Sequence, residues 1–238
     1  MIDTPPLPFP PRVEIRFTTR LGGFSQPPFD GFNLGLHVGD DPENVRKNRA
    51  LLDTHLPAPP HWLEQNHTAQ VIELPNCNRQ ADASIARTPN MVCAILTADC
   101  LPILLADSFG EAVAAIHAGW RGLAQGIVEK TAEKMAIPST RLWAYLGPAI
   151  CPACYAVGEE MMASFASEDH TAFRKKNNRW YCDLFGLAEQ RLSNLGITSI
   201  FSERCCTFCN SRFFSYRRDK TTGRMASLIW LAARKKNP

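Results

Sequence analysis

Alternation of apolar and polar residues near the start of the chain predicts a strand with one buried face. The pattern runs over Val13–Thr19. Residues 21–41 then contain five glycines and two prolines, which predicts a long ordered loop or a chain of turns. Asp41 before Pro42 is typical of a helix start, with Asp as the cap and Pro in the first turn. The residues that keep this helix in register are Val45, Arg49, Leu52 and Leu56.

Longer apolar runs predict four strands in the middle of the chain. They cover residues 62–74, 91–97, 102–107 and 111–117. The second and third of these are nearly all apolar, so we expect both of their faces to be buried.

The second half of the chain mixes helical and strand patterns. An apolar stripe indicates a helix after Gly122, and Gly196 is placed to end another helix as a left-handed cap. The stripe consists of Leu123, Ile127, Thr131 and Met135. The remaining predicted elements are strands at 141–145, 180–183, 197–202 and 226–231 and helices at 158–167 and 184–195. We therefore predict an α+β (mixed α/β) fold: a single domain over residues 1–238, with mixed β-sheets flanked by helices.

Composition narrows the class of protein. Of the 238 residues, 45% are apolar and 21% are charged, which excludes a mostly disordered chain. No apolar run approaches the roughly 18–20 residues of a membrane-spanning helix. The N-terminal segment holds five prolines and lacks the apolar core of a secretory signal, so we expect a cytoplasmic protein. Its nine cysteines are then expected to be thiols or metal ligands rather than disulfides.

Charge is spread unevenly along the chain. The net charge is +3, but residues 203–238 alone carry nine Lys or Arg against two acidic residues. Such a basic segment could face an anion such as phosphate or nucleic acid. We expect Lys235 and Lys236, at its end, to form only a solvated tail.

Three short segments place reactive side chains at the ends of predicted strands. Asp99 and Cys100 lie between two buried strands, where a charged group needs a partner. His117 ends a strand before a glycine turn that contains Arg121, and His67 lies in a strand-like segment. Strand ends that lead into glycine turns often carry reactive groups. A single His or Cys in such a strand is usually a packed core residue, so the prediction rests on their occurrence together.

The chain resembles the laccase-domain family over nearly its whole length. Proteins of this family were first described as multicopper polyphenol oxidases and later as purine nucleoside phosphorylases. The most specific matching segments are Thr97–Pro102, with the sequence TADCLP, and His117–Gly122, with HAGWRG. The other matching segments are Thr18–Gly23, Asn33–Gly35, Ala81–Ala83, Leu146–Ile150, Phe214–Asp219 and Thr222–Arg224. The resemblance implies a CNF/laccase-domain-like fold.

The resemblance also implies a single zinc ion, held by His67, Cys100 and His117, which are the predicted catalytic residues. In the family, the first ligand comes from a Gln-Val-His-Gly segment. Here Asn66 replaces Val and Thr68 replaces Gly, so we expect the turn and the pocket wall to differ there. Two His and one Cys suit zinc, and three protein ligands leave a fourth position for water, whose pKa zinc lowers towards about 7.

The implied function is that of a zinc-dependent purine nucleoside enzyme. Its reactions are phosphorolysis of adenosine, inosine and methylthioadenosine, and deamination of adenosine. In nucleobase deaminases, water activated at related His/Cys zinc sites attacks the purine ring at C6. The expected partners are a small-molecule nucleoside and phosphate, rather than nucleic acid or a membrane. Guanidinium groups bind oxyanions bidentately, so we expect Arg121, Arg217 and Arg218 to bind phosphate, with surface salt bridges as the alternative for the last two. Asn33 is also predicted to bind substrate or phosphate.

Two further metal assignments can be weighed on the sequence. A multicopper laccase needs many imidazoles, commonly in His-x-His pairs, whereas this chain has six His and no such pair. Two His and one Cys could still hold a single copper, as in a single-copper polyphenol oxidase. The pairs Cys151/Cys154 and Cys206/Cys209 are 51 residues apart, against roughly 15–20 in a zinc ribbon. We therefore expect these four to be partly buried thiols rather than a second metal site.

Two other functions stay open on the sequence. Cys100 could be a nucleophile with His117 as its base, in a Cys-His hydrolase that acts on an amide of a cell-wall precursor. The protein could instead be a binding protein, with a structural zinc and a basic C-terminal segment for an acidic partner. A closed site with four protein ligands would favour that function, and Asp99 is the candidate for a fourth ligand. We expect Asp99 instead to accept hydrogen bonds beside the site.

Overall fold

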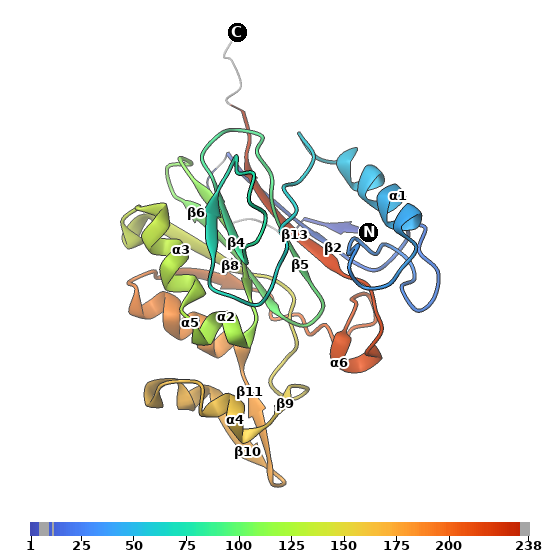
Figure 1. The fold of residues 1–238 in the computed structure, drawn as a ribbon. Helices are drawn as coiled ribbons and strands as arrows, with labels where there is room; N and C mark the ends of the chain where they lie inside the picture. The colour runs from blue at the N-terminus through green and yellow to red at the C-terminus, as the bar shows by residue number, and fades with distance from the viewer. Residues whose placement is uncertain (5–9, 11, 234–238) are drawn as a thin grey trace.

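Two β-sheets pack against each other in the centre of the molecule, and helices lie on their outer faces (Figure 1). A computed structural model describes residues 1–4, 10 and 12–233. Ile15 and Ile95 from one sheet and Leu104 and Ala115 from the other share the apolar layer between the sheets. The protein therefore has the predicted α+β fold.

The first sheet has four antiparallel strands in the order β1-β2-β13-β5. They are β1 (Ile2–Asp3), β2 (Val13–Thr18), β13 (Met225–Leu231) and β5 (Cys93–Thr97). β2 alternates buried and half-buried residues over most of its length, as its sequence predicts. β5 and β13 are buried throughout. Their outer face is covered by α1 (Pro42–Asp53), whose Leu52 packs with Leu96 and Leu228.

The second sheet has six strands in the order β12-β8-β6-β7-β4-β3. They are β3 (Val71–Glu73), β4 (Ala83–Ala86), β6 (Leu101–Asp107), β7 (Val113–Ala118), β8 (Leu142–Leu146) and β12 (Ser199–Ser202). Each edge strand is parallel to its neighbour: β3 pairs with β4, and β12 pairs with β8. The central pairs are antiparallel. β6 and β7 are buried at every position, because the first sheet covers one face and helices α3 (Ile127–Met135) and α5 (Leu184–Asn194) cover the other.

Local sequence signals set the ends of the longer helices. The Asp41 carboxylate accepts a hydrogen bond from Glu43 N at 2.9 Å, which caps α1 as predicted. Gly196 follows α5 with a φ of +82° and gives the predicted left-handed end. The shorter helices are α2 (Trp120–Ala124), α4 (Glu159–Met162), α6 (Tyr216–Asp219) and the 3-10 helices η1 (Ser139–Arg141) and η2 (Ser167–Ala172). Of the helices in the described ranges, none is long and apolar enough to cross a membrane.

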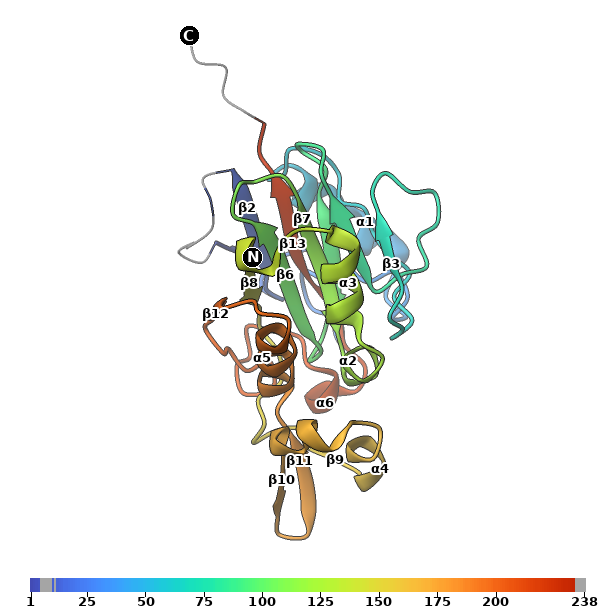
Figure 2. The ribbon, with the colours of Figure 1, turned by 90° about the vertical axis from the view of Figure 1, so that its left-hand side faces the viewer.

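A small third sheet projects from the main body, next to α4 (Figure 2). Its antiparallel strands are β9 (Ala156–Val157), β11 (Arg179–Cys182) and β10 (Phe173–Lys176). β9 follows the cysteine-containing segment after β8. This projection starts directly after Tyr155, which lines the cavity described below.

Several predicted elements differ from the structure. Within the predicted strand at 62–74, only β3 is a strand, because the backbone at residues 66–68 bonds to a carboxylate instead of a neighbouring strand. The predicted helix after Gly122 begins earlier and is split into α2 and α3 by Gly126, at a φ of +77°. The predicted helix at 158–167 ends at Met162. Lys235 and Lys236, the predicted solvated tail, lie outside the described residues.

Candidate metal centre and its cavity

His67, Cys100 and His117 converge at one end of the six-stranded sheet. Cys100 lies in the bend between β5 and β6, and His117 lies near the end of β7, opposite Pro102 of β6. His67 comes from the loop before β3. Each residue offers one ligand atom within 4.8 Å of those of the other two, and the two imidazole rings are 4.8 Å apart at an angle of 72°. The three residues could therefore hold one metal ion.

The buried carboxylate of Asp82 orients both histidines. Its Oδ1 atom lies 2.8 Å from Nδ1 of His117, which leaves Nε2 as the nitrogen that could bind a metal. The same carboxylate accepts hydrogen bonds from the backbone N–H groups of Asn66, His67 and Thr68, at 2.7–3.2 Å. A carboxylate in this position fixes the ring orientation of a metal-binding histidine.

The residues that flank His67 differ from the family pattern, and one of them, Thr68, strengthens this turn. The hydroxyl of Thr68 donates a further hydrogen bond to Asp82 at 2.8 Å, and Asn66 contributes through its backbone. His67 itself has a φ of +58°, in the left-handed region that His tolerates better than most residues. The altered turn therefore still presents His67 to the other two residues.

Asp99, next to Cys100 in the chain, accepts hydrogen bonds beside the site. Its Oδ1 atom accepts a hydrogen bond from the hydroxyl of Thr207, and its Oδ2 atom accepts one from the backbone N–H of Arg217, both at 2.6 Å. Its φ is +94°, which places a strained bend just before Cys100. Asp99 is not in the His67–Cys100–His117 group of possible ligands.

Gly119 gives the three residues room to approach one another. A Cβ atom at this position would lie 3.1 Å from Sγ of Cys100 and 3.3 Å from Cδ2 of His67. Both distances are shorter than ordinary van der Waals contact between such atoms. The crowding at the site therefore requires glycine at position 119, the first of the two glycines in the HAGWRG segment.

The protonation states of the site are coupled. Burial raises the pKa of Cys100, but the charge and hydrogen bond of His117, together with the hydrogen bond of His67, outweigh it and lower the pKa to about 6. Burial lowers the pKa of His117, but Cys100 and Asp82 outweigh it and raise the pKa to about 9. In the metal-free protein near neutral pH, the pair is therefore a thiolate beside an imidazolium.

A cavity of about 390 Å³ opens beside these residues, a size within the range of small-molecule sites. Arg121 and Arg217 line it, and their guanidinium carbons lie 4.3 Å and 5.1 Å from the ring centres of Trp120 and Tyr155. Arg121 is exposed and lies in the short helix α2. Both of these predicted phosphate-binding residues thus lie next to the candidate metal ligands.

The comparison with known proteins gives the family. The sequence profile of the family described as multi-copper polyphenol oxidoreductase laccase matches residues 14–232. The chain belongs to this family. Relatives from Shigella flexneri and Escherichia coli K12 are both described as purine nucleoside phosphorylase YfiH. Each is 47% identical to this chain over 236 residues, which cover 95% of this chain and 97% of the relative.

Solved structures share the fold. The crystal structure of protein NMB0706 from Neisseria meningitidis matches with a TM-score of 0.93 and 42% identity. The match covers 98% of this chain and 99% of the other. The predicted family and fold class are therefore confirmed.

Two other predicted binding residues lie elsewhere. The guanidinium of Arg218 donates to the carboxylate of Asp219 and to the carbonyl groups of Thr207, Phe208 and Phe213. The buried side chain of Asn33 bonds to its own loop and accepts a hydrogen bond from the backbone of Arg224. Neither is among the residues that line the cavity, and both stabilise loops instead.

Sequence reasoning assigned no role to two charged residues near the site. Asp82 appears in the sequence only as part of a matching segment, because its contacts depend on the fold. Burial lowers the pKa of Arg224, while the nearby Cys100 and Asp99 act in the opposite direction. The Arg224 guanidinium is therefore within electrostatic reach of the site.

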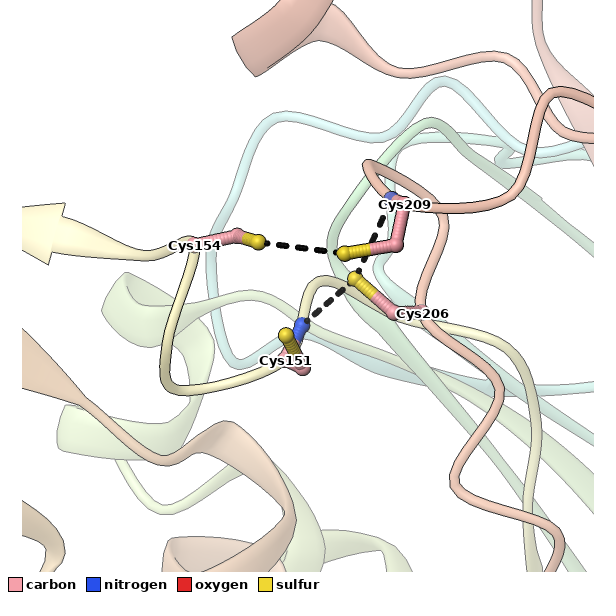
Figure 3. Close-up of side chains that lie close together, drawn as sticks. All are labelled: Cys151, Cys154, Cys206 and Cys209. Atoms are coloured by element: carbon pink, nitrogen blue, oxygen red, sulfur yellow. Dashed lines mark hydrogen bonds between the residues drawn. The ribbon is translucent and has the colours of Figure 1, made fainter.

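The two Cys-x-x-Cys pairs lie together in space (Figure 3). All four sulfur atoms are within 4.8 Å of one another, so the group could hold a metal. The 51 residues between the pairs do not keep them apart, because Ala149 and Cys206 form a parallel β-bridge. Spacing along the chain was therefore a poor guide to the placement of these cysteines.

Proposed function

We propose that the protein is a zinc-dependent purine nucleoside enzyme that cleaves adenosine, inosine and methylthioadenosine with phosphate and deaminates adenosine. The observation that carries the proposal is the His67–Cys100–His117 group, of which His67 and Cys100 line a cavity that two arginines also line. The relatives described as purine nucleoside phosphorylases support the same class of substrate.

The donor set suits zinc at this site. It offers two imidazole nitrogens and one sulfur, and the lowered pKa of Cys100 favours the thiolate that binds a metal. When bound, zinc supplies a Lewis acid beside the cavity. Copper would also accept these donors, so metal analysis must accompany every activity measurement.

The cavity residues fit phosphorolysis. In this reaction a phosphate oxygen attacks C1′ of the ribose, the bond from C1′ to the base nitrogen breaks, and the base leaves with the bonding electron pair. Arg121 and Arg217 hold the phosphate, because guanidinium groups bind and neutralise oxyanions. The rings of Trp120 and Tyr155, which line the same cavity, offer surfaces on which a base can stack.

Deamination uses the same cavity with water instead of phosphate. Water adds to C6 of adenosine, and ammonia leaves. The role of Asp82 is common to both reactions, because it orients His67 and His117.

Product analysis with adenosine, in the presence and absence of phosphate, tests this proposal. Adenine and ribose 1-phosphate formed only with phosphate support phosphorolysis, and inosine supports deamination. Zinc is measured on the same samples. Cys100→Ala should lose both activities and the zinc of this site, whereas Cys77→Ala, at an exposed cysteine, should keep them. Zinc-replete wild-type protein that leaves adenosine, inosine and methylthioadenosine unchanged would contradict the proposal.

A specific observation also favours a second candidate, a Cys-His hydrolase. Cys100, His117 and Asp82 form a thiolate–imidazole–carboxylate series, with the last two 2.8 Å apart. Such a series can activate a cysteine nucleophile towards an amide. Zinc would bind this sulfur and suppress its nucleophilicity. Amide hydrolysis that increases when zinc is removed would therefore support the hydrolase, and a loss of activity on zinc removal would support the nucleoside enzyme.

A further inference from the structure

Four cysteines form a compact cluster outside the His67–Cys100–His117 group. Cys151 and Cys154 lie in the loop between β8 and β9, and Cys206 and Cys209 lie in the loop between β12 and α6. All four sulfur atoms lie within 4.8 Å of one another, and those of Cys154 and Cys209 are 3.3 Å apart (Figure 3). Around a tetrahedral zinc with Zn–S bonds of about 2.3 Å, sulfur atoms are about 3.8 Å apart. The cluster is therefore close to the size that a zinc ion requires.

Each Cys-x-x-Cys pair is held in a tight turn. Cys154 N donates to Cys151 O at 3.0 Å, and Asn210 N donates to Cys206 O at 3.1 Å. The Sγ atom of Cys206 also accepts hydrogen bonds from the backbone N–H groups of Cys151 and Cys209, at 3.3 Å and 3.4 Å. Hydrogen bonds of this kind favour a thiolate, which is the form that binds a metal.

Backbone hydrogen bonds hold the two loops together. Ala149 N donates to Cys205 O, and Thr207 N donates to Ala149 O, both at 3.1 Å. These bonds form the parallel bridge that sets Cys206 beside the start of the first loop. The four sulfur atoms are thus brought together by the fold, and a metal would bind a largely pre-formed site.

We propose that Cys151, Cys154, Cys206 and Cys209 bind one structural zinc ion, in addition to any metal held by His67, Cys100 and His117. Four thiolates complete the tetrahedron and leave no position for water or substrate, which is typical of structural zinc. Disulfide bonds would require sulfur atoms about 2.05 Å apart. The Sγ atoms of Cys154 and Cys209 are 3.3 Å apart, and all nine cysteines are free.

The zinc would support one wall of the cavity. Tyr155, which lines the cavity, directly follows Cys154. Thr207, which directly follows Cys206, donates its hydroxyl hydrogen bond to Asp99. By tying the two loops together, the zinc would fix Tyr155 in the cavity wall. It would also fix Thr207, whose hydrogen bond to Asp99 supports the bend before Cys100. The inference concerns metal binding alone and does not depend on the proposed nucleoside chemistry.

The test isolates the cluster by removing the other candidate site. Full-length His67→Ala/Cys100→Ala protein should contain one zinc per chain, and X-ray absorption at the zinc edge should show four sulfur ligands at about 2.3 Å. Adding Cys154→Ser and Cys209→Ser to this protein should reduce its zinc to a trace. Adding Cys77→Ser instead, at an exposed cysteine outside the cluster, should leave the zinc unchanged.

The absorption measurement on the protein with all four cysteines does not depend on the folding of the serine variants. The proposal is overturned if the His67→Ala/Cys100→Ala protein contains no zinc, contains iron in its place, or has nitrogen or oxygen among the zinc ligands. It is also overturned if mass spectrometry without reductant finds these cysteines in disulfides. If wild-type protein with zinc at both sites leaves the nucleosides unchanged while the His67→Ala/Cys100→Ala protein keeps its one zinc, the proposed function fails and the cluster assignment stays supported.

Discussion

Oδ1 of Asp82 lies 2.8 Å from Nδ1 of His117, while the same carboxylate accepts the backbone N–H of His67 at 3.0 Å. One buried side chain thus links two candidate metal ligands that are 50 positions apart in the sequence. Burial raises the pKa of Asp82, but hydrogen bonds from His117 and Thr68 outweigh it and lower the pKa to about 2. The carboxylate therefore stays ionised over the whole physiological pH range.

Replacement of Asp82 by Asn should weaken both the metal site and the fold. The amide keeps one acceptor oxygen but turns a donor towards backbone N–H groups. Zinc affinity should fall by about 10–100-fold, as expected for loss of a carboxylate that orients a ligand. The free energy of unfolding should fall by about 1–3 kcal/mol, because buried donors lose their acceptor. Competitive chelation and denaturant unfolding measure the two effects.

The exposed Glu64 provides a matched control for this substitution. Glu64→Gln removes one negative charge from the same segment of the chain and should leave zinc affinity and stability unchanged. Unaltered zinc affinity in Asp82→Asn would show that the histidines hold their positions without the carboxylate.

Gly119→Ala should reduce zinc affinity at least tenfold, because the added Cβ would lie 3.1 Å from Sγ of Cys100. Relief of this contact requires movement of a candidate ligand. Gly110→Ala is the control, since this residue has a φ of +67° and lies near Arg12, away from the site. It should lower the melting temperature without changing zinc affinity. Equal zinc affinity in wild type and Gly119→Ala would refute the crowding argument.

The alkylation of Cys100 in the metal-free protein should follow its lowered pKa. The thiolate is the reactive form, so the rate should be constant above about pH 7 and fall as the pH drops through about 6. An ordinary thiol would show this fall near pH 9. In His117→Ala the midpoint should move upwards, because burial remains and the main opposing group is gone. Peptide-level mass spectrometry after iodoacetamide treatment separates Cys100 from the other eight cysteines. A midpoint near 9 in wild type would contradict the thiolate–imidazolium pair.

Arg121→Lys should raise the phosphate concentration needed for adenosine cleavage by about tenfold, because lysine keeps the charge but loses the bidentate geometry. Deamination and zinc content should change less, since water replaces phosphate in that reaction. Phosphate titrations of both reactions provide the measurement. Arg46→Lys, at an exposed position on α1, is the matched control. If both reactions decline equally and the apparent phosphate affinity is unchanged, Arg121 shapes the cavity instead of binding phosphate.

Much of the fold follows from local sequence patterns. The alternation at Val13–Thr19 and the apolar runs of β5 and β6 predict strands and their burial, because side-chain direction repeats every two residues along a strand. Asp41 and Gly196 mark helix ends through their own side-chain or backbone chemistry. β4 was missed, since its short run of small residues gives little periodic signal.

The sequence by itself pointed to His67, Cys100 and His117 as candidate metal ligands, because their residue types and flanking motifs match a family pattern. Tertiary structure alone decided what surrounds them. It placed Asp82 against both histidines, left Arg218 and Asn33 out of the cavity lining, and brought Cys151 and Cys154 close to Cys206 and Cys209. These relationships depend on strand pairing and loop return between residues far apart in the chain. Local patterns do not record them, because contact energy depends on distance in space rather than along the sequence.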